Sequence, residues 1–174
     1  DGADRRLTRE MLVIADAERA QAIAGVMGGA DSEVSQGTRV VALESAFFQP
    51  VSVRRTSKQL GLSTEASYRF ERGADISQPV VALERVRALL ERIGAGRARG
   101  PVIDRYPTPR VPGRITFRHS RIRRLLGQSI DPAFVARTLA HLGFTLVALR
   151  DAEGQDGDSW WEVTVPAYRV DVTR

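Results

Sequence analysis

The sequence contains no cysteine among its 174 residues. This absence excludes disulfides, cysteine nucleophiles and thiolate metal sites, and it fits a reducing compartment, so we expect a cytoplasmic protein. Only two histidines are present, His119 and His141, and their separation suggests neither a two-histidine metal motif nor a local Ser-His pair. No apolar run approaches the length that crosses a membrane, so no membrane partner is expected. Covalent catalysis has little support.

Lysine is almost absent too, because Lys58 is the only one and the remaining cations are arginines. The total of 26 basic against 21 acidic residues points only weakly toward a polyanionic partner. The distribution is more informative, since no acidic residue occurs from Arg105 to Ile130, a stretch that holds seven arginines. Such a cluster can line a phosphate backbone, or it can be a solvated helix face plus a charged linker, and both interpretations stay open.

The length allows one large domain or two small ones, and a hydrophobic content of 43% is enough for a packed core. Composition changes abruptly near residue 94, where glycines and prolines become frequent up to Gly113. We therefore predict a domain over 1–100, a linker over 101–112 and a second domain over 113–174. The polar start, Asp1 to Arg5, is typical of the middle of a surface loop, so a fragment of a longer protein is expected.

Short apolar segments dominate the first 45 residues. The patterns predict strands at 11–15 and 21–27 and a buried strand at 40–43. The glycines from 25 to 29 let the backbone turn sharply or approach a ligand, although a plain hairpin turn is the more common explanation. Glu44 follows the third run, and a carboxylate at the end of a buried strand is costly unless it meets a donor.

Helix signals follow. Pro50 suits a first helical position and Gly61 a helix end, which predicts a helix over 50–60. The small and polar residues at 64–67 are suited to a surface that a ligand approaches closely, and the Arg69, Glu71, Arg72 cluster that comes next is typical of a salt-bridged clamp.

A longer helix is predicted over 77–93, with Ser77 as its cap and Gly94 at its end. Its apolar residues recur at helical spacing and are expected to lie in the core rather than in a site. They are Val80, Leu83, Val86, Leu90 and Ile93.

The second domain reads as a strand, two helices and a hairpin, the order of a winged helix. The predicted strands cover 115–118, 144–149 and 160–165, with a polar loop at 150–159. The predicted helices cover 120–126, which Gly127 ends, and the segment that Asp131 caps and Gly143 closes. This architecture is common among nucleic-acid binders, but a fold does not set a function.

Four motifs in order resemble the β subunit of bacterial phenylalanyl-tRNA synthetases. They are GVMGG at 25–29, LESAFF at 43–48, LSTEASYRFERG at 62–73 and PAYRVDV at 166–172. The resemblance covers essentially the whole chain. It implies an α+β protein in which the first domain is the later part of a tRNA-editing domain with mixed sheets. The second would be a winged-helix-like domain truncated at its C-terminal end.

The resemblance also implies a heterotetramer of two α and two β subunits that charges phenylalanine-specific tRNA, using ATP and Mg²⁺. In that family the editing domain hydrolyses tyrosine wrongly attached to the tRNA. By the same resemblance, Glu44 would accept a hydrogen bond from the tyrosine hydroxyl. Gly25 and Gly28 would line the pocket, with Thr64 and Ala66 on its opposite wall.

The chain departs from the family at Ser63, Glu65 and Tyr68, where many relatives have histidine, aspartate and histidine. We interpret these as tolerated variation at the pocket rim. Asp171 matches the first of four family carboxylates that bind magnesium, and the other three would lie beyond Arg174. Because one carboxylate cannot hold that ion, no metal or other cofactor is expected in this fragment.

Two alternatives accompany the editing interpretation. The fragment could be a non-catalytic scaffold within the same enzyme, serving subunit packing or tRNA support. It could instead be an unrelated winged-helix nucleic-acid binder, whose salt-dependent affinity would depend on Arg118, Arg121 and Arg124.

Overall fold

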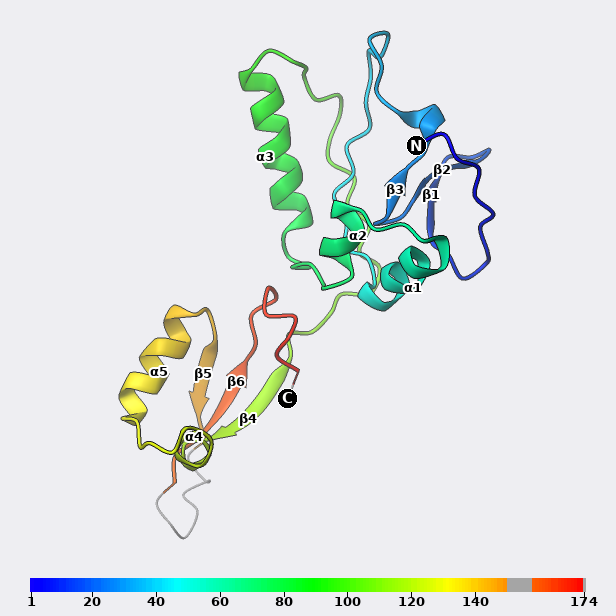
Figure 1. The fold of residues 1–174 in the computed structure, drawn as a ribbon. Helices are drawn as coiled ribbons and strands as arrows, with labels where there is room; N and C mark the ends of the chain where they lie inside the picture. Colours follow the sequence, from blue (N-terminus) through cyan, green and yellow to red (C-terminus); the bar gives the residue numbers. More distant parts are fainter. Residues whose placement is uncertain (150–157, 174) are drawn as a thin grey trace. The chain divides into compact units, whose positions relative to one another are not determined.

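The structure, a computed structural model, describes residues 1–149 and 158–173. The chain forms two compact units, Asp1–Asp104 and Arg105–Arg174, each described by itself (Figure 1). Both units combine helices with a small three-stranded sheet, which confirms the α+β class. Both sheets are entirely antiparallel.

The sheet of the first unit runs in the order β1-β2-β3, with β1 at Val13–Ala15, β2 at Ala20–Ile23 and β3 at Met27–Gly28. The single strand predicted over 21–27 is wrong, because the chain turns between β2 and β3. Gly25 has a φ of +68° in this turn, and the Val26 amide donates to the Ile23 carbonyl at 2.9 Å. Glycine adopts this left-handed conformation without a steric penalty, so an apolar run became a hairpin. A short 3-10 helix, η1, follows at Ala30–Ser32.

The buried strand predicted at 40–43 is also wrong. These residues belong to no strand, and Val40, Val41 and Leu43 are 66%, 50% and 44% exposed. The apolar run has the composition of a strand buried on both faces, but no neighbouring strand of the described chain pairs with it. Composition predicts a tendency to pair and cannot supply the partner.

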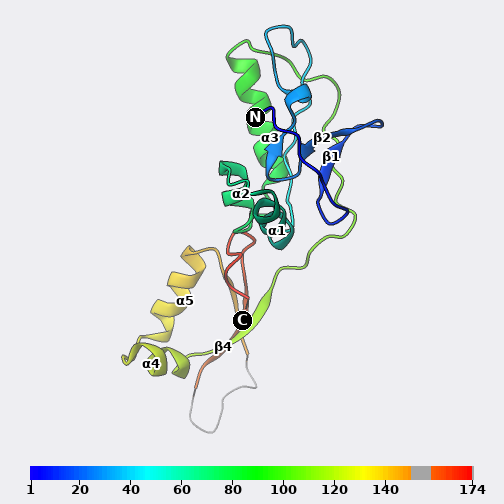
Figure 2. The same ribbon diagram turned by 45° about the vertical axis from the view of Figure 1, so that its right-hand side comes forward.

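Helix α1 spans Pro50–Leu60 and ends at Gly61 in the left-handed conformation, which confirms the predicted helix and both of its termini. Helix α2 spans Glu65–Phe70 and lies beside α1 in both ribbon views (Figures 1 and 2). No helix was predicted there. The core of this unit gathers between the helices and the β2–β3 turn, where buried Val26, Val53 and Leu62 contact Phe48 and Phe70, among others.

Helix α3 spans Pro79–Arg92 and confirms the long predicted helix, although Gln78 rather than Ser77 is its N-cap. The expectation that its apolar stripe lies in the core is wrong. No residue of α3 is buried, and both Val80 and Val86 are 41% exposed. Helical periodicity identifies an apolar face but not what covers it, and the described chain leaves this one largely uncovered.

The second unit has the predicted element order. It comprises β4 at Arg114–Arg118, α4 at Ser120–Leu126, α5 at Pro132–His141, β5 at Thr145–Ala148 and β6 at Trp160–Thr164. The sheet order β4-β6-β5 gives a strand, two helices and a hairpin, which is a winged-helix arrangement. Asp131 caps α5 as predicted, accepting a 3.0 Å hydrogen bond from the Phe134 amide. The polar loop predicted at 150–159 lies largely outside the described residues.

The core of this unit forms on one face of the β4-β6-β5 sheet. Trp161 and Val163 alternate along β6 and are 8% and 2% exposed, and they pack with Phe144 and Val165. The neighbouring Trp160 faces the other way, with the Arg118 guanidinium 4.9 Å from its ring centroid. Within the described part of the chain, no helix combines the length and apolar character needed to cross a membrane.

Candidate functional site

The turn between β2 and β3 requires glycine at position 25 for two reasons. Its φ of +68° is one that L side chains rarely adopt. A Cβ atom there would also lie 2.9 Å from the Phe48 ring and 3.0 Å from Val53. Because both neighbours belong to the core, they have little room to move. Gly25 is therefore a packing position, where a side chain would collide with the core.

Gly28 has a different environment. It is exposed at the end of β3, and a Cβ atom added to it would meet nothing within 4 Å. It borders a hollow of about 370 Å³ whose other lining comes from residues 1–5, Leu7, β2 and residues 27–32. Glu44, Thr64 and Ala66 are not among the residues that line this hollow. Gly28 thus has open space on its Cβ side, whereas core side chains fill that side of Gly25.

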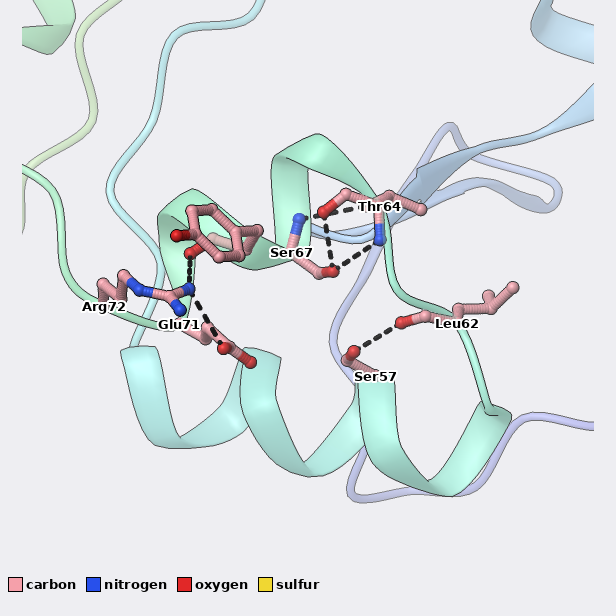
Figure 3. Close-up of polar contacts among 7 residues, drawn as sticks. Ser57, Leu62, Thr64, Ser67, Glu71 and Arg72 are labelled. Carbon is pink, nitrogen blue, oxygen red and sulfur yellow. Dashed lines mark hydrogen bonds and ion pairs between the residues drawn. The ribbon is translucent and has the colours of Figure 1, made fainter.

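Thr64 caps helix α2 through a reciprocal pair of hydrogen bonds with Ser67, shown in Figure 3. The Ser67 amide donates to the Thr64 hydroxyl at 3.0 Å, and the Thr64 amide donates to the Ser67 hydroxyl at 2.9 Å. The Thr64 hydroxyl in turn donates to the Val26 carbonyl at 2.6 Å. This bond joins the start of α2 to the β2–β3 turn. It brings Thr64 close to the Gly25 turn, with half-buried Ala66 in the first turn of α2.

Glu44 lies in the irregular segment before α1 and is exposed. Partial desolvation raises the pKa of its carboxyl group above the usual value. Among the described residues it makes no hydrogen bond or ion pair. Four residues later, Phe48 packs edge-on against Phe70 of α2 with ring centroids 5.0 Å apart, which anchors the segment to the same core. No described hydrogen bond joins Glu44 to the two glycines, Thr64 or Ala66.

The Arg69, Glu71, Arg72 cluster is ion-paired, as a clamp requires, but the pairs are local. Arg72 contacts Glu71 at 3.3 Å, whereas Arg69 reaches back to Glu65 at 3.5 Å. The Arg72 guanidinium also lies 3.4 Å from the ring centroid of the exposed Tyr68. The predicted clamp is confirmed in part.

Asp171, the predicted magnesium ligand, lies in the second unit with both carboxylate oxygens engaged. Arg169 donates from Nε and Nη2 to the two oxygens at 2.9 Å each. This hydrogen bonding lowers the pKa of the Asp171 carboxyl and raises that of the Arg169 guanidinium. The described residues hold no group of three His, Cys, Asp or Glu side chains that could bind a metal. The residues present here therefore do not fit a magnesium centre.

Sequence reasoning missed the buried serines that organise this region. Ser67 is 2% exposed, and Ser57 on α1 donates to the Leu62 carbonyl just beyond the helix (Figure 3). The Thr64-x-x-Ser67 spacing was an available signal, because a hydroxyl cap followed three residues later by a second polar side chain is typical of a helix start. No comparable local signal exists for the contact between Thr64 and Val26, which are 38 residues apart.

Comparisons with known proteins give a family match for each of the two units. The B3/4 domain family matches residues 1–95, and the tRNA synthetase B5 domain matches residues 115–174. The chain is 42% identical over its whole length to the phenylalanine–tRNA ligase beta subunit of Geobacter sulfurreducens. The corresponding subunits of Anaeromyxobacter dehalogenans and Pseudomonas syringae pv. tomato are 43% and 44% identical over 99% of the chain. In each case the match covers 21% of the relative, so the chain spans about a fifth of the length of these curated relatives.

Proposed function

Because this chain belongs to the B3/4 domain family and is homologous to phenylalanine–tRNA ligase beta subunits over about a fifth of their length, we propose that it works within such a ligase. The complete enzyme would join phenylalanine to its tRNA in the cytoplasm, using ATP and Mg²⁺, as a heterotetramer with an α subunit. The first unit of this chain would contribute the pocket that hydrolyses tyrosine from mischarged tRNA. About four-fifths of the relatives' length lies outside this match. We therefore assign the joining of phenylalanine to tRNA, with its use of ATP and Mg²⁺, to other parts of the enzyme.

The observation that carries this proposal is the hydrogen bond from Thr64 to the Val26 carbonyl. It fixes two backbone segments side by side, each ending in small residues: Gly28 at the end of β3 and Ala66 in the first turn of α2. Small residues on both segments would leave room for an aromatic ring and for the terminal adenosine of a tRNA. The Thr64 cap and the buried Val26 would hold these segments in place.

Glu44 would supply specificity. Among the described residues its carboxylate has no hydrogen-bond partner, so it is free to accept a bond from the phenolic hydroxyl of tyrosine. Phenylalanine lacks that hydroxyl and would leave the carboxylate desolvated and unpaired. Sites that bind a substrate hydroxyl in this way discriminate by roughly 10⁴ or more against the analogue that lacks it. Partial desolvation already raises the pKa of the Glu44 carboxyl group above its usual value.

The hydrolysis itself does not require a nucleophilic side chain. An aminoacyl ester is already activated, and a water molecule held against its carbonyl carbon can attack directly. The ester C–O bond then breaks, and the terminal ribose oxygen leaves and takes a proton. Orientation of the ester and water, with a neighbouring ribose hydroxyl and backbone amides stabilising the developing negative charge, would account for the rate. The role of this chain would therefore be to bind the aminoacyl ester and to position it for attack by water.

Magnesium and ATP are assigned to the complete enzyme and to no step in this chain. Arg169 engages both oxygens of Asp171, and among the described residues that carboxylate belongs to no group of three His, Cys, Asp or Glu side chains that could hold a metal.

The proposal is tested with Glu44→Ala in the assembled ligase. We expect hydrolysis of tyrosyl-tRNA specific for phenylalanine to fall about tenfold to 100-fold, the cost of losing one charged hydrogen bond. Charging with phenylalanine should stay near its native rate, because synthesis occurs elsewhere. The control is Glu33→Ala, which removes another exposed carboxylate from the first unit. If Glu44→Ala leaves both activities unchanged, or lowers both equally, Glu44 does not belong to a separate editing pocket.

A second candidate function concerns the other unit, whose winged-helix arrangement is common among nucleic-acid binders. Exposed Arg121, Arg123 and Arg124 all lie on α4, which carries no acidic residue. This observation supports a non-catalytic role in holding nucleic acid or a neighbouring subunit. Under this reading, neutral substitutions on α4 would weaken tRNA binding or subunit assembly and leave the hydrolytic rate constant at saturating substrate unchanged.

A further inference from the structure

The outer face of helix α1 is basic and contains no acid. Its inward side is set by the buried residues Val53, Thr56 and Ser57. Arg54, Arg55 and Lys58 are exposed. With 3.6 residues per turn, these three cations fall within an arc of about 100° directly opposite the buried side. The helix sequence, PVSVRRTSKQL, provides no aspartate or glutamate to neutralise them.

Arg54, Arg55 and Lys58 are also unpaired, whereas some arginines elsewhere in the first unit have carboxylate partners. Within the described chain none of Arg54, Arg55 and Lys58 makes an ion pair or a side-chain hydrogen bond. Five other arginines of this unit do form ion pairs: Arg5 with Asp1, Arg19 with Asp31, Arg69 with Glu65, Arg72 with Glu71 and Arg87 with Glu84. The α1 face therefore carries three positive charges that no carboxylate of the described chain neutralises.

Helix stability does not account for this arrangement. Arg54 and Lys58 are four residues apart, and like charges at that spacing destabilise a helix by a few tenths of a kcal/mol. Lys58 lies in the last turn, where the helix dipole favours a cation, but Arg54 and Arg55 lie in the middle of the helix and gain nothing from it. An external anion bound across these cations would relieve the charge repulsion.

The composition of the face indicates what that anion is. Its one apolar residue is Val51, which is 60% exposed, so the face lacks the buried aromatic or aliphatic anchor that protein interfaces depend on. Guanidinium groups pair with phosphate through two parallel hydrogen bonds, and repeated phosphates match a row of cations. These features favour a nucleic-acid backbone over an acidic protein surface.

We propose that the outer face of α1 binds the phosphate backbone of the tRNA whose 3′ end enters the pocket described above; this inference rests on the proposed function. The buried side of the same helix packs against the turn that leads into β3 and Gly28, because Val53 lies 3.0 Å from the position of a Cβ atom on Gly25, and α1 also packs against α2. The two sides are separated by one helix diameter, about 10 Å, which equals the rise of about three stacked nucleotides.

The test compares two triple variants of the full-length β subunit, assembled with the α subunit. The first is Arg54→Gln, Arg55→Gln and Lys58→Gln. The control is Arg85→Gln, Arg92→Gln and Arg97→Gln, which removes the same charge from exposed positions on and after α3. Binding of uncharged tRNA is measured between 50 and 200 mM salt. For the α1 variant we expect affinity at 50 mM salt to fall about tenfold and the slope of log affinity against log salt to flatten by about 2 to 3.

Hydrolysis gives a second readout. The KM for tyrosyl-tRNA should rise about tenfold in the α1 variant with an unchanged kcat, because the phosphates contribute binding but not chemistry. Hydrolysis of 3′-O-tyrosyl adenosine, which carries no phosphate, should be unaffected. Equal losses of tRNA affinity in both triple variants, or none in the α1 variant, would overturn the inference. Unchanged tRNA binding with weakened α-subunit assembly would instead assign the face to a protein partner, which also overturns it.

The inference and the proposed function fail in different ways. If the native enzyme does not hydrolyse tyrosyl-tRNA, the editing assignment fails, while the binding measurement still decides whether the α1 face contacts RNA. If the native enzyme hydrolyses tyrosyl-tRNA and the α1 variant binds tRNA normally, the pocket stands and only the α1 inference falls.

Discussion

The hydroxyl of Thr64 donates a 2.6 Å hydrogen bond to the carbonyl of Val26, a residue 38 positions earlier in the chain. Val26 is 1% exposed, so without this bond its carbonyl would have lost water with no compensating donor in view. One hydroxyl group thus caps a helix and satisfies a buried turn. Much of the geometry assigned to the candidate pocket depends on this contact, which makes Thr64 the first position to alter.

Replacing Thr64 with alanine removes both interactions at once. We expect the free energy of unfolding to fall by about 2 kcal/mol, roughly half from the lost helix cap and half from the unsatisfied Val26 carbonyl. Thr64→Ser keeps the hydroxyl and should stay within about 0.5 kcal/mol of the native chain. Chemical denaturation of the three proteins, followed by circular dichroism, measures the difference. Equal stability of the alanine and serine variants would show that neither the helix cap nor the Val26 contact contributes to stability.

The two candidate-site glycines should respond differently to alanine. Gly25→Ala places a methyl group 2.9 Å from the Phe48 ring at a φ of +68°, so we expect a loss of about 2 to 4 kcal/mol. Gly28→Ala meets open space and should cost less than about 1 kcal/mol, while slowing tyrosyl-tRNA hydrolysis if position 28 faces the substrate. Thermal unfolding and the hydrolysis assay separate the two effects. A destabilised Gly28→Ala variant would assign that glycine a structural role.

Local signals predicted the helices well wherever both ends carried residues that are typical of helix termini. Pro50 and Gly61 bracket α1, and Asp131 caps α5 as its position before Pro132 suggested. Helix α2 was missed because its six residues are small, polar or aromatic and show no apolar period, so its start depends on the Thr64 and Ser67 cap. Periodicity thus identifies long helices, whereas short ones depend on side-chain geometry.

The failures at 21–27, at 40–43 and along α3 have a different cause. Each is an apolar pattern whose outcome depends on a partner or on a backbone conformation that the local sequence does not specify. Gly25 turned one predicted strand into a hairpin, and Val40 and Val80 lie exposed where burial was expected. For the candidate site, residue identities came from motifs, but the proximity of Thr64 to the Gly25 turn required the folded structure. Whether Glu44 shares a pocket with these residues stays a prediction.

Glu44 should give stability a specific pH dependence. Its pKa is raised in the folded chain by partial desolvation, so its ionisation opposes folding. This destabilisation is absent below the pKa of Glu44 in the unfolded chain, and it develops as the pH rises through the pKa of Glu44 in the folded chain. Glu44→Gln removes it, and we expect the variant to be more stable than the native chain at pH 7, by no more than about 0.5 kcal/mol for a largely solvated group. At pH 3 the two should unfold at the same temperature. A variant that is less stable at pH 7 would mean that the carboxylate has a stabilising partner.

The second unit should bind nucleic acid without recognising its base sequence. In a winged-helix arrangement the second helix, here α5, is the element expected to enter a major groove. Among the residue types that recognise base edges through paired hydrogen bonds, α5 offers only Arg137, and one such contact discriminates by about 1 to 3 kcal/mol. We therefore expect duplexes of unrelated sequence to bind within about 100-fold of one another, with the salt dependence set by the arginines of α4. Competition binding with a random duplex library measures this. Enrichment of one sequence by more than 10³-fold would require base contacts beyond Arg137 and would favour a dedicated DNA-binding role over service to a ligase.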